Sequence, residues 1–481
     1  MSTRIVFRNT GMLVIAQAIA APLSVLVNAV AARKLGAEDY GLLFQSLAFS
    51  TFAFLFVEWG QSAVLTARVA TQRQLAGRFL GSALAFRLGA AVVVGLLVLA
   101  ACAMARFPAR LIAIMSLSMV GLTIGTVVLA CHDTMRGFER AELAAGTYVS
   151  WQLMSAGVVV PVLLLGAGIF GYQITQICCA AVGCAVVVWL LPRLKVPALE
   201  VKADVVKDLF LSGRPFLIFG IVLLLQPLID SAWLSELLPP PSKDVGWYAA
   251  ARKLVGALSY PGSALTASLY PTLVRLKIES LQTYRRTMAD ALYAVTVMVL
   301  PVALGCALFP SLGIAIFGQS GYAPAERDLV MLAPYLALVF LSMPIGACLA
   351  SSGRQNLWTA VQLGSVLVSL IFDPLFITWF LRHTGNGGLG VCLAASISEL
   401  LMVAGGLLLL PAGILRVLPW SRLAAVALSG GVMAGVAAAS TGWPEALRAV
   451  AATAAYLLCL QLSGGFNFLQ TRALLREIRG H

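Results

Sequence analysis

Fourteen long apolar runs, separated by short polar loops, dominate this sequence. They lie at about residues 11–32, 41–63, 80–105, 109–131, 143–167, 172–192, 213–236, 246–268, 289–316, 328–352, 356–380, 387–411, 420–440 and 446–464. A helix needs roughly 20 apolar residues to cross a bilayer, and each run meets that length. The sequence therefore predicts an all-α polytopic membrane protein with about 14 transmembrane helices.

The composition is typical of an integral membrane protein. Hydrophobic residues make up 60% of it and charged residues only 11%, whereas a soluble protein is about half apolar and a quarter charged. No stretch outside the runs is long enough to bury a soluble core, so we expect no extramembrane catalytic domain. The nine cysteines and three histidines form no cluster with ligand spacing, which predicts neither disulfides nor a metal site.

The formal net charge of +13 is unevenly distributed along the chain. Lysine and arginine gather at the N-terminus, in the loops after even-numbered runs, and at the C-terminus. The positive-inside rule reads this pattern as cytoplasmic N- and C-termini. The excess charge is thus a topology signal, and we expect no binding to nucleic acid.

A duplicated pattern divides the chain. Asp39-Tyr40-Gly41 returns 205 residues later as Asp244-Val245-Gly246, and the same offset places Pro22 on Pro227. Further on, "MRGFERAEL" (135–143) resembles "SSGRQNLWTA" (351–360). Aspartate and glycine in the repeated loop are residue types that cap a helix or permit a positive φ. The matches keep their order, so we infer a duplicated unit of six helices.

An even number of helices means that both copies enter the membrane from the same side. The two lobes then form a parallel repeat, related by a pseudo-two-fold axis along the membrane normal, with a central cleft between them. The predicted organisation is an N-lobe (1–192, helices 1–6), a cytoplasmic inter-lobe linker (193–212), a C-lobe (213–411, helices 7–12), and a last segment (412–481) with helices 13 and 14 and a basic cytoplasmic tail.

Three stretches carry a resemblance to a known family: "ARKLGAEDYG", "VGWYAAARKLVGAL…YPTLVRL" and "SSGRQNLWTAVQLG…GGLGVCLAASISELL". The chain resembles the polysaccharide-transporter branch, with its Wzx-type O-antigen and exopolysaccharide flippases, of the multidrug/oligosaccharidyl-lipid/polysaccharide (MOP) exporter superfamily. The resemblance implies a MATE-like fold and a flippase in the bacterial inner membrane. It also implies a cargo, an undecaprenyl-diphosphate-linked oligosaccharide, carried by alternating access from the cytoplasmic to the periplasmic leaflet.

Charged residues inside apolar runs are costly and usually face a cavity or a partner. A diphosphate cargo calls for cations, so the substrate-binding candidates are Arg87, Arg252 and Lys253. Arg87 lies about two turns into its helix, where snorkelling to the interface is the competing interpretation. Arg252 and Lys253 point about 100° apart on a helix and cannot both line one cleft well, and Arg252 is preferred.

Buried carboxylates and polar residues complete the candidate set. Asp230, Asp373 and Glu399 are candidates for ion coupling or charge pairing, with Asp230 able to accept a proton or Na⁺ or to pair with Arg252. Gln17 and Asn28 are further substrate-binding candidates in the first helix. The matched prolines, Pro22 and Pro227, are candidate hinges, because a mid-helix proline removes an amide donor and bends the helix. A static kink is the competing interpretation.

Three function classes compete. A flippase fits the loop motifs and the mixed charge inside the runs. A cation-coupled multidrug or lipid exporter of the same superfamily would need an acidic chamber. A membrane glycosyltransferase or O-antigen polymerase would need a larger extramembrane loop. We therefore predict a transporter and not an enzyme, with no cofactor or catalytic residues. No Walker loop is present, so Na⁺ or H⁺ coupling or removal of product would drive transport. Candidate partners are the bilayer and polysaccharide polymerase or export machinery.

Overall fold

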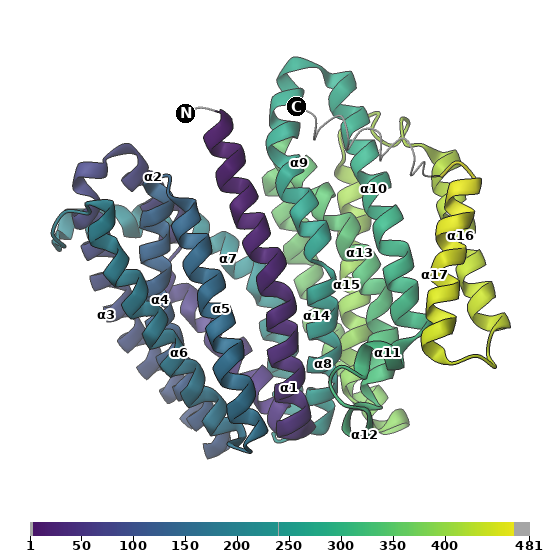
Figure 1. Ribbon diagram of the computed structural model, residues 1–481, viewed down its shortest axis with the longest axis horizontal. Coiled ribbons are helices and arrows are strands. Elements are labelled where there is room, and N and C mark those ends of the chain that lie inside the picture. Colours follow the sequence, from purple (N-terminus) through teal and green to yellow (C-terminus); the bar gives the residue numbers. More distant parts are fainter. Residues whose placement is uncertain (1–2, 239, 466–481) are drawn as a thin grey trace. The chain divides into compact units, whose positions relative to one another are not determined.

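The computed structural model describes residues 3–238 and 240–465, which are almost wholly helical and contain no strand (Figure 1). The helices are α1 (Thr3–Glu58), α2 (Gln61–Thr71), η1 (Arg73–Leu75), α3 (Ala76–Met104), α4 (Ala109–Gly137), α5 (Ala141–Leu164), α6 (Gly168–Leu190), η2 (Leu191–Leu194), α7 (Ala203–Leu237), α8 (Lys243–Leu258), α9 (Tyr260–Glu279), α10 (Leu281–Leu308), α11 (Pro310–Ile314), α12 (Gln319–Tyr322), α13 (Ala325–Ser351), α14 (Gln355–Thr384), α15 (Gly388–Leu409), α16 (Trp420–Ala439) and α17 (Glu445–Leu462).

Twelve candidate membrane spans occur among the described residues, each long and apolar enough to cross a bilayer. The first, Ile19–Thr71, contains two of the expected passes, because α1 breaks at Gly36 (φ 77°, ψ 170°). Another expected pass, 246–268, runs through α8 and α9 across Ser259 and is not among the twelve. The prediction of an all-helical, multi-pass membrane protein with about 14 passes is confirmed.

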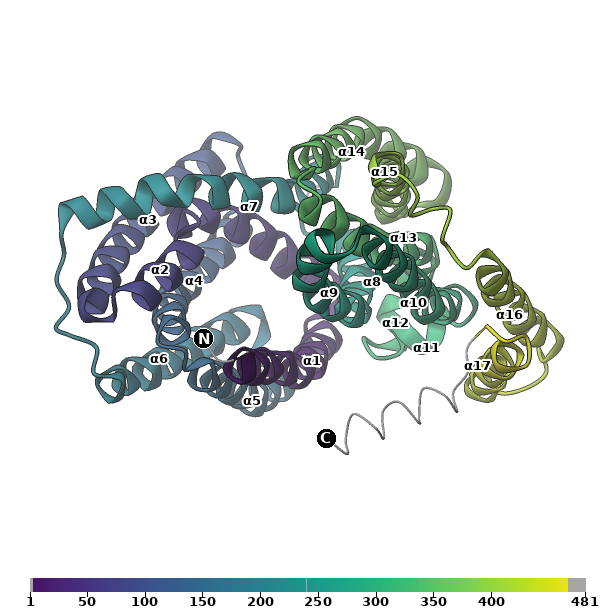
Figure 2. The same ribbon diagram turned by 90° about the horizontal axis from the view of Figure 1, so that it is seen from above.

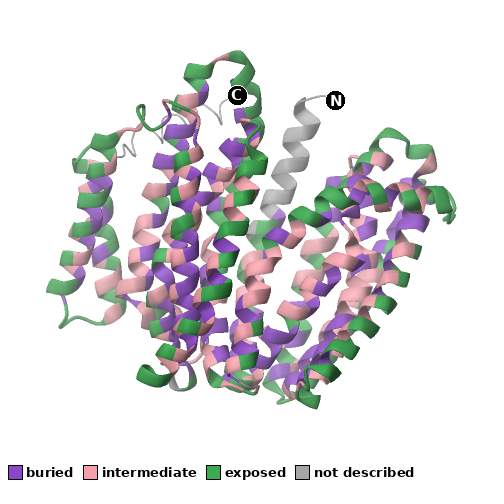
Figure 3. Ribbon diagram, turned by 180° about the vertical axis from the view of Figure 1, so that it is seen from behind, coloured by how far each residue is buried: buried purple, intermediate pink, exposed green. Residues whose placement is uncertain are grey.

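Many residues along the spans are exposed (Figure 3), and large apolar residues are among them. On α3, for example, Val92, Leu96 and Leu97 are each 64% exposed. A water-soluble protein rarely leaves so much contiguous apolar surface uncovered. Such an apolar surface is suited to contact with lipid tails.

The chain folds into two compact units, Met1–Ala249 and Ala250–His481. In the first unit α4 is central and packs against α1, α2, α3, α5 and α6, while α7 lies alongside α1, α2 and α3 (Figure 2). Its core includes Leu65, Leu80 and Met135, all fully buried. In the second unit α13 is central and packs against α9, α10, α14 and α15. The lobe boundaries drawn from the repeat stay a prediction.

The last two spans form a pair at one side of the second unit. Helices α16 and α17 pack against each other and against α10. Their shared core includes Met433, Tyr456 and Leu460, and the Tyr456 hydroxyl donates to the backbone oxygen of Val297 on α10 (3.0 Å). One face of the pair is therefore fastened to the rest of the second unit.

The two copies of the repeated loop contact each other within the first unit. A Cβ on Gly246 would lie 1.9 Å from the backbone oxygen of Ala37, and a Cβ on Gly41 would lie 2.9 Å from the backbone nitrogen of Gly246. Neither glycine has a positive φ; the left-handed residue of the first copy is Gly36. The expectation of a positive φ at Gly41 and Gly246 is therefore wrong; both glycines instead allow a close backbone contact.

An extended segment, residues 195–202, joins α6 to α7 and lies across the start of α3. Cβ atoms on Gly77 and Gly81 would fall 2.4 and 2.6 Å from backbone oxygens of this segment. Ser82 accepts a hydrogen bond from the Lys202 backbone nitrogen (3.0 Å), and Arg78 pairs with Glu200 (2.9 Å). Small residues on α3 therefore let the connection pack directly against the helix backbone.

Candidate functional site

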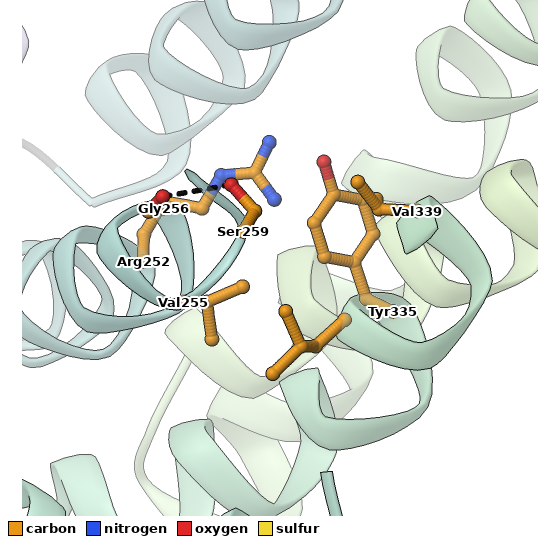
Figure 4. Close-up of a pocket in the computed structure, with 7 residues that line it drawn as sticks. Arg252, Val255, Gly256, Ser259, Tyr335 and Val339 are labelled. Carbon is orange, nitrogen blue, oxygen red and sulfur yellow. Dashed lines mark hydrogen bonds between the residues drawn. The ribbon is translucent and has the colours of Figure 1, made fainter. Parts of the chain in front are cut away.

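A small pocket in the second unit holds one of the predicted cations. Arg252, on α8, places its guanidinium 4.4 Å from the ring centroid of Tyr335, on α13, in a cation–π contact (Figure 4). Val255, Gly256 and Ser259 of the α8 region and Val339 of α13 complete most of the lining, around a volume of about 120 Å³. Because Val255 and Gly256 follow Arg252 by three and four residues on α8, these three residues share one side of the helix and line the pocket together.

Glu399 lies close to this pocket in the same unit. Its side chain is buried on α15, and the Ser342 hydroxyl of α13 donates a hydrogen bond to it. Arg252 lies within electrostatic range of this carboxylate. Tyr335, Val339 and Ser342 follow one another at helical spacing, so one face of α13 carries the contacts to both Arg252 and Glu399. A guanidinium, a phenol and a carboxylate are thus gathered in one part of the second unit.

The other candidates of the second unit are held elsewhere. Lys253 does not line the pocket, as expected for a residue turned about 100° from Arg252. Asp373, on α14 before Pro374, is buried, and one turn earlier a hydrogen bond between Ser369 and Ser398 (2.9 Å) ties α14 to α15. No group of three potential metal ligands occurs among the described residues. The roles of Lys253 and Asp373 stay predictions.

Arg87 is fully buried in the first unit, among carboxylates. Its Nη2 lies 3.4 Å from Asp133 Oδ2 and 3.8 Å from Glu58 Oε1. Its Nε donates to Gln61 (3.4 Å), and Asp133 pairs in turn with Arg136 (2.9 Å). Four helices therefore meet at this guanidinium, and Arg87 does not snorkel to the interface. A binding role for Arg87 stays a prediction.

Glu58 also organises the turn between α1 and α2. Its carboxylate accepts hydrogen bonds from the backbone nitrogens of Gly60 (2.9 Å) and Ser62 (2.7 Å). These amides are at the start of α2, where a helix lacks internal acceptors. The Glu58 carboxylate therefore belongs both to the ion-pair cluster around Arg87 and to the start of α2. The α1–α2 turn thereby helps to set the position of Arg87.

The remaining predicted residues are spread along α1 and α7. Asp230 accepts from the Tyr248 hydroxyl (3.1 Å), and Asn28 joins the Ser24 backbone oxygen (2.7 Å) to the Tyr40 hydroxyl (3.3 Å). Gln17 is exposed. Pro22 and Pro227 lie inside α1 and α7, and the described break in α1 is at Gly36 instead. Hinge, ion and substrate roles for these residues stay predictions.

A family model described as "Polysaccharide biosynthesis protein" matches residues 6–277, more than half of the chain. The chain belongs to this family. The family is part of the MOP superfamily, so the resemblance carried by the loop motifs is confirmed. No curated protein sequence matches this chain at a significant level.

Solved MOP structures share the fold of this family member. The lipid II flippase MurJ, in an inward closed conformation, aligns at 12% identity over 96% of this chain and 99% of its own, with a TM-score of 0.75. An inward-facing multidrug resistance MATE transporter aligns at 15% identity over 82% and 94% of the two chains (TM-score 0.59). A MOP transporter from Pyrococcus furiosus aligns at 16% over 85% and 95% (TM-score 0.57). The MATE-like fold prediction is confirmed.

Sequence reasoning missed three residues of these clusters. Asp133 lies just beyond the predicted end of its apolar run at residue 131, while the helix continues to Gly137. The i, i+3 spacing of Asp133 and Arg136 was the available signal. Tyr335 and Ser342 lie inside an apolar run, and only their uncharged hydroxyls mark them as polar. Seven residues apart, they share a helix face, but a sequence cannot show which cation that face meets.

Proposed function

We propose that this membrane transporter moves an undecaprenyl-diphosphate-linked oligosaccharide from the cytoplasmic to the periplasmic leaflet of the bacterial inner membrane. Membership of the polysaccharide biosynthesis family supports the cargo class. The observation that carries the proposal is Arg252, whose guanidinium lies against the Tyr335 ring and lines a pocket. Transport is by alternating access through the cleft that the repeat predicts, with both termini in the cytoplasm.

The chemistry of the pocket suits a phosphorylated, hydroxyl-rich cargo. A guanidinium offers forked donors to phosphate oxygens, and its hydrogen bonds to an anion are stronger than neutral ones. An aromatic face such as Tyr335 offers apolar surface and a hydroxyl in one group. We assign Arg252 to the diphosphate and Tyr335 to holding its guanidinium, with Ser259 as a further donor. Gln17, Asn28 and Lys253 would contact cargo elsewhere along the path.

Energy would come from an ion gradient or from removal of product. Glu399 is the coupling candidate that the geometry favours, because its buried carboxylate lies within the electrostatic reach of Arg252. Neutralising it by a proton would release the attraction between the two groups. Asp230 and Asp373 are the alternative coupling residues.

Pro22 and Pro227 would let α1 and α7 bend. P22A and P227A should therefore slow transport at unchanged protein level. Full activity of the double variant would contradict this role.

A cation-coupled exporter of the same superfamily is the second candidate. The buried carboxylates of Asp373 and Glu399 favour it, since a cationic cargo needs acidic groups. The guanidinium at the pocket opposes it, because two cations at membrane depth would repel each other. The two candidates thus differ in the sign of the cargo charge.

Deletion of the gene in its own bacterium, followed by analysis of undecaprenyl-linked sugars, tests the proposal. Lipid-linked oligosaccharide should accumulate on the cytoplasmic leaflet, and surface polysaccharide should be lost. The wild-type gene should restore both, R252A should not, and R275A should. Arg275 is a suitable control because it is exposed and already paired with Glu279. Normal surface polysaccharide together with raised drug sensitivity would favour the exporter.

A further inference from the structure

One end of the second unit carries a group of cations on three neighbouring connections. They lie where α9 meets α10, where α13 meets α14, and where α15 meets α16 (Figure 1). Five of these cations are Lys277, Arg285, Arg354, Arg416 and Arg422. None of the five forms an ion pair with another described residue, whereas Arg275 nearby pairs with Glu279. We call these five residues the basic end.

Specific contacts join three of these cations into one surface. Lys277 Nζ donates to the backbone oxygen of Ser352 (2.9 Å), two residues before Arg354. Arg354 Nη1 donates to the backbone oxygen of Leu409 (2.6 Å), at the end of α15. The Arg285 guanidinium rests on the backbone of Gly413, where a Cβ would be 3.1 Å from its Cζ. Each cation therefore touches the connection that carries the next.

The connection between α15 and α16 is built into the core. Leu410 and Ile414 are buried in the cluster that includes Tyr284, Met288 and Leu349. Gly413 has a φ of +91°, which lets the chain turn between these two anchors and leaves room for Arg285. Arg285 Nε is buried without a hydrogen-bond partner in the described part of the chain. The arginines of the basic end therefore lie on or against a connection that is anchored in the core.

Exposed apolar side chains alternate with cations along this connection. Leu415 and Val417 are each 40% exposed and flank Arg416, and Trp420 is 62% exposed two residues before Arg422. The Trp420 indole nitrogen donates to the Leu415 backbone oxygen (3.2 Å). Tryptophan and aliphatic residues mixed with arginine are typical of segments that lie at the boundary between headgroups and acyl chains.

We propose that the basic end is a binding site for the phosphate headgroup of an anionic phospholipid. The guanidinium groups of Arg285 and Arg354 would contact phosphate oxygens, with Lys277 and Arg416 at the edge. Leu415, Val417 and Trp420 would pack against the acyl chains of the same lipid. Basic surfaces beside membrane helices hold anionic headgroups through the attraction of several cations. A free phosphate would use the guanidinium groups alone, so the apolar side chains favour a lipid.

Lipid retention by the purified full-length protein tests the site. Native mass spectrometry would compare phosphatidylglycerol and cardiolipin with phosphatidylcholine. Wild type should retain the anionic lipids and release the zwitterionic one. R285Q/R354Q should retain them at least about tenfold less, since about 1 kcal/mol is contributed by each cation near an anionic surface. Equal retention of anionic and zwitterionic lipid by wild type would overturn the proposal.

A matched control uses the two ends of α14. Arg354 precedes its first residue and Arg382 lies in its last turn, and both are exposed. R382Q should retain anionic lipid as wild type does, whereas R354Q alone should retain less. If R382Q loses as much as R354Q, binding reflects net charge and the proposed site is wrong.

Two further measurements separate folding and the source of the phosphate from the site itself. R416Q/R422Q changes only exposed side chains, so it should fold and still lose part of the retention; unchanged retention would count against the site. Excess inorganic phosphate should leave the lipid bound, because it cannot replace the acyl-chain contacts. Displacement by phosphate would show that the site takes a free anion and would overturn the lipid assignment.

Discussion

Two arginines, one fully buried and one half-buried, show two ways in which a membrane protein holds a cation. Arg87, in the first unit, has no exposed surface and is surrounded by Asp133, Glu58 and Gln61. Arg252, in the second, is half-buried, lies over the Tyr335 ring and borders a pocket. The neighbours of Arg87 are carboxylates within ion-pair distance, while Arg252 lies against an aromatic face.

The difference separates a structural role from a binding role. A guanidinium already neutralised by carboxylates gains little from a further anion, and removing its partners leaves a buried charge. Arg252 borders a pocket, so a phosphate group of a ligand could reach its guanidinium beside the Tyr335 ring. We therefore expect Arg87 to stabilise the fold and Arg252 to bind cargo. The predictions below test that division.

The largest effect should come from removing the partner of Arg87. D133A leaves the guanidinium buried with only the more distant Glu58 carboxylate, and breaking a buried pair costs about 3–5 kcal/mol. We expect a markedly lower unfolding temperature in detergent and poor accumulation in the membrane. R87Q/D133N, which removes both charges, should recover part of the loss. A D133A protein as stable as wild type would show that the pair does not hold the fold.

Next in size should be the effect of R252A on transport. Loss of a charged hydrogen bond to the diphosphate costs about 1.5–3 kcal/mol, which lowers the rate at limiting substrate about 10- to 100-fold. The unfolding temperature should change little, because the pocket leaves room for the truncation. R252K should recover only part of the rate, since lysine lacks the forked donors. A large drop in stability with normal transport per folded molecule would reverse the comparison with Arg87.

A smaller effect is expected where Ser342 supports Glu399. S342A removes a hydrogen bond to a buried carboxylate, at a cost of about 1–3 kcal/mol in unfolding free energy. Thermal unfolding of the purified variant measures it. S263A is the control, because Ser263 is exposed and bonds only within its own helix. Identical unfolding temperatures for S342A and S263A would contradict the contact.

The smallest effect should come from an exposed pair. Arg68 and Asp208 join α2 to α7 at 2.8 Å, with side chains 42% and 38% exposed. Exposed pairs contribute about 0–1 kcal/mol, since water screens both charges. D208N should therefore change the unfolding temperature far less than D133A does. A comparable loss in the two variants would mean that burial does not distinguish these ion pairs.

Most of the fold could be predicted from the sequence, because lipid requires long apolar helices and their lengths are visible in the hydropathy pattern. Contacts across helices could not. The apolar run ends at residue 131, but α4 continues to Gly137 and includes Asp133. The hydropathy pattern therefore did not indicate that Asp133 is a partner of Arg87. Gly41 and Gly246 looked like turn residues, yet they permit a backbone contact between segments about 200 residues apart, which no local pattern encodes.

Leaflet exchange in reconstituted vesicles would measure the proposed transport of lipid-linked oligosaccharide. Proteoliposomes would carry a fluorescent undecaprenyl-diphosphate oligosaccharide, and an impermeant quencher would report the fraction in each leaflet over time. Exchange should be rapid with wild type and with R382A, and should be near the protein-free rate with R252A. Exchange by R252A at the wild-type rate, or none with any variant, would contradict the proposal.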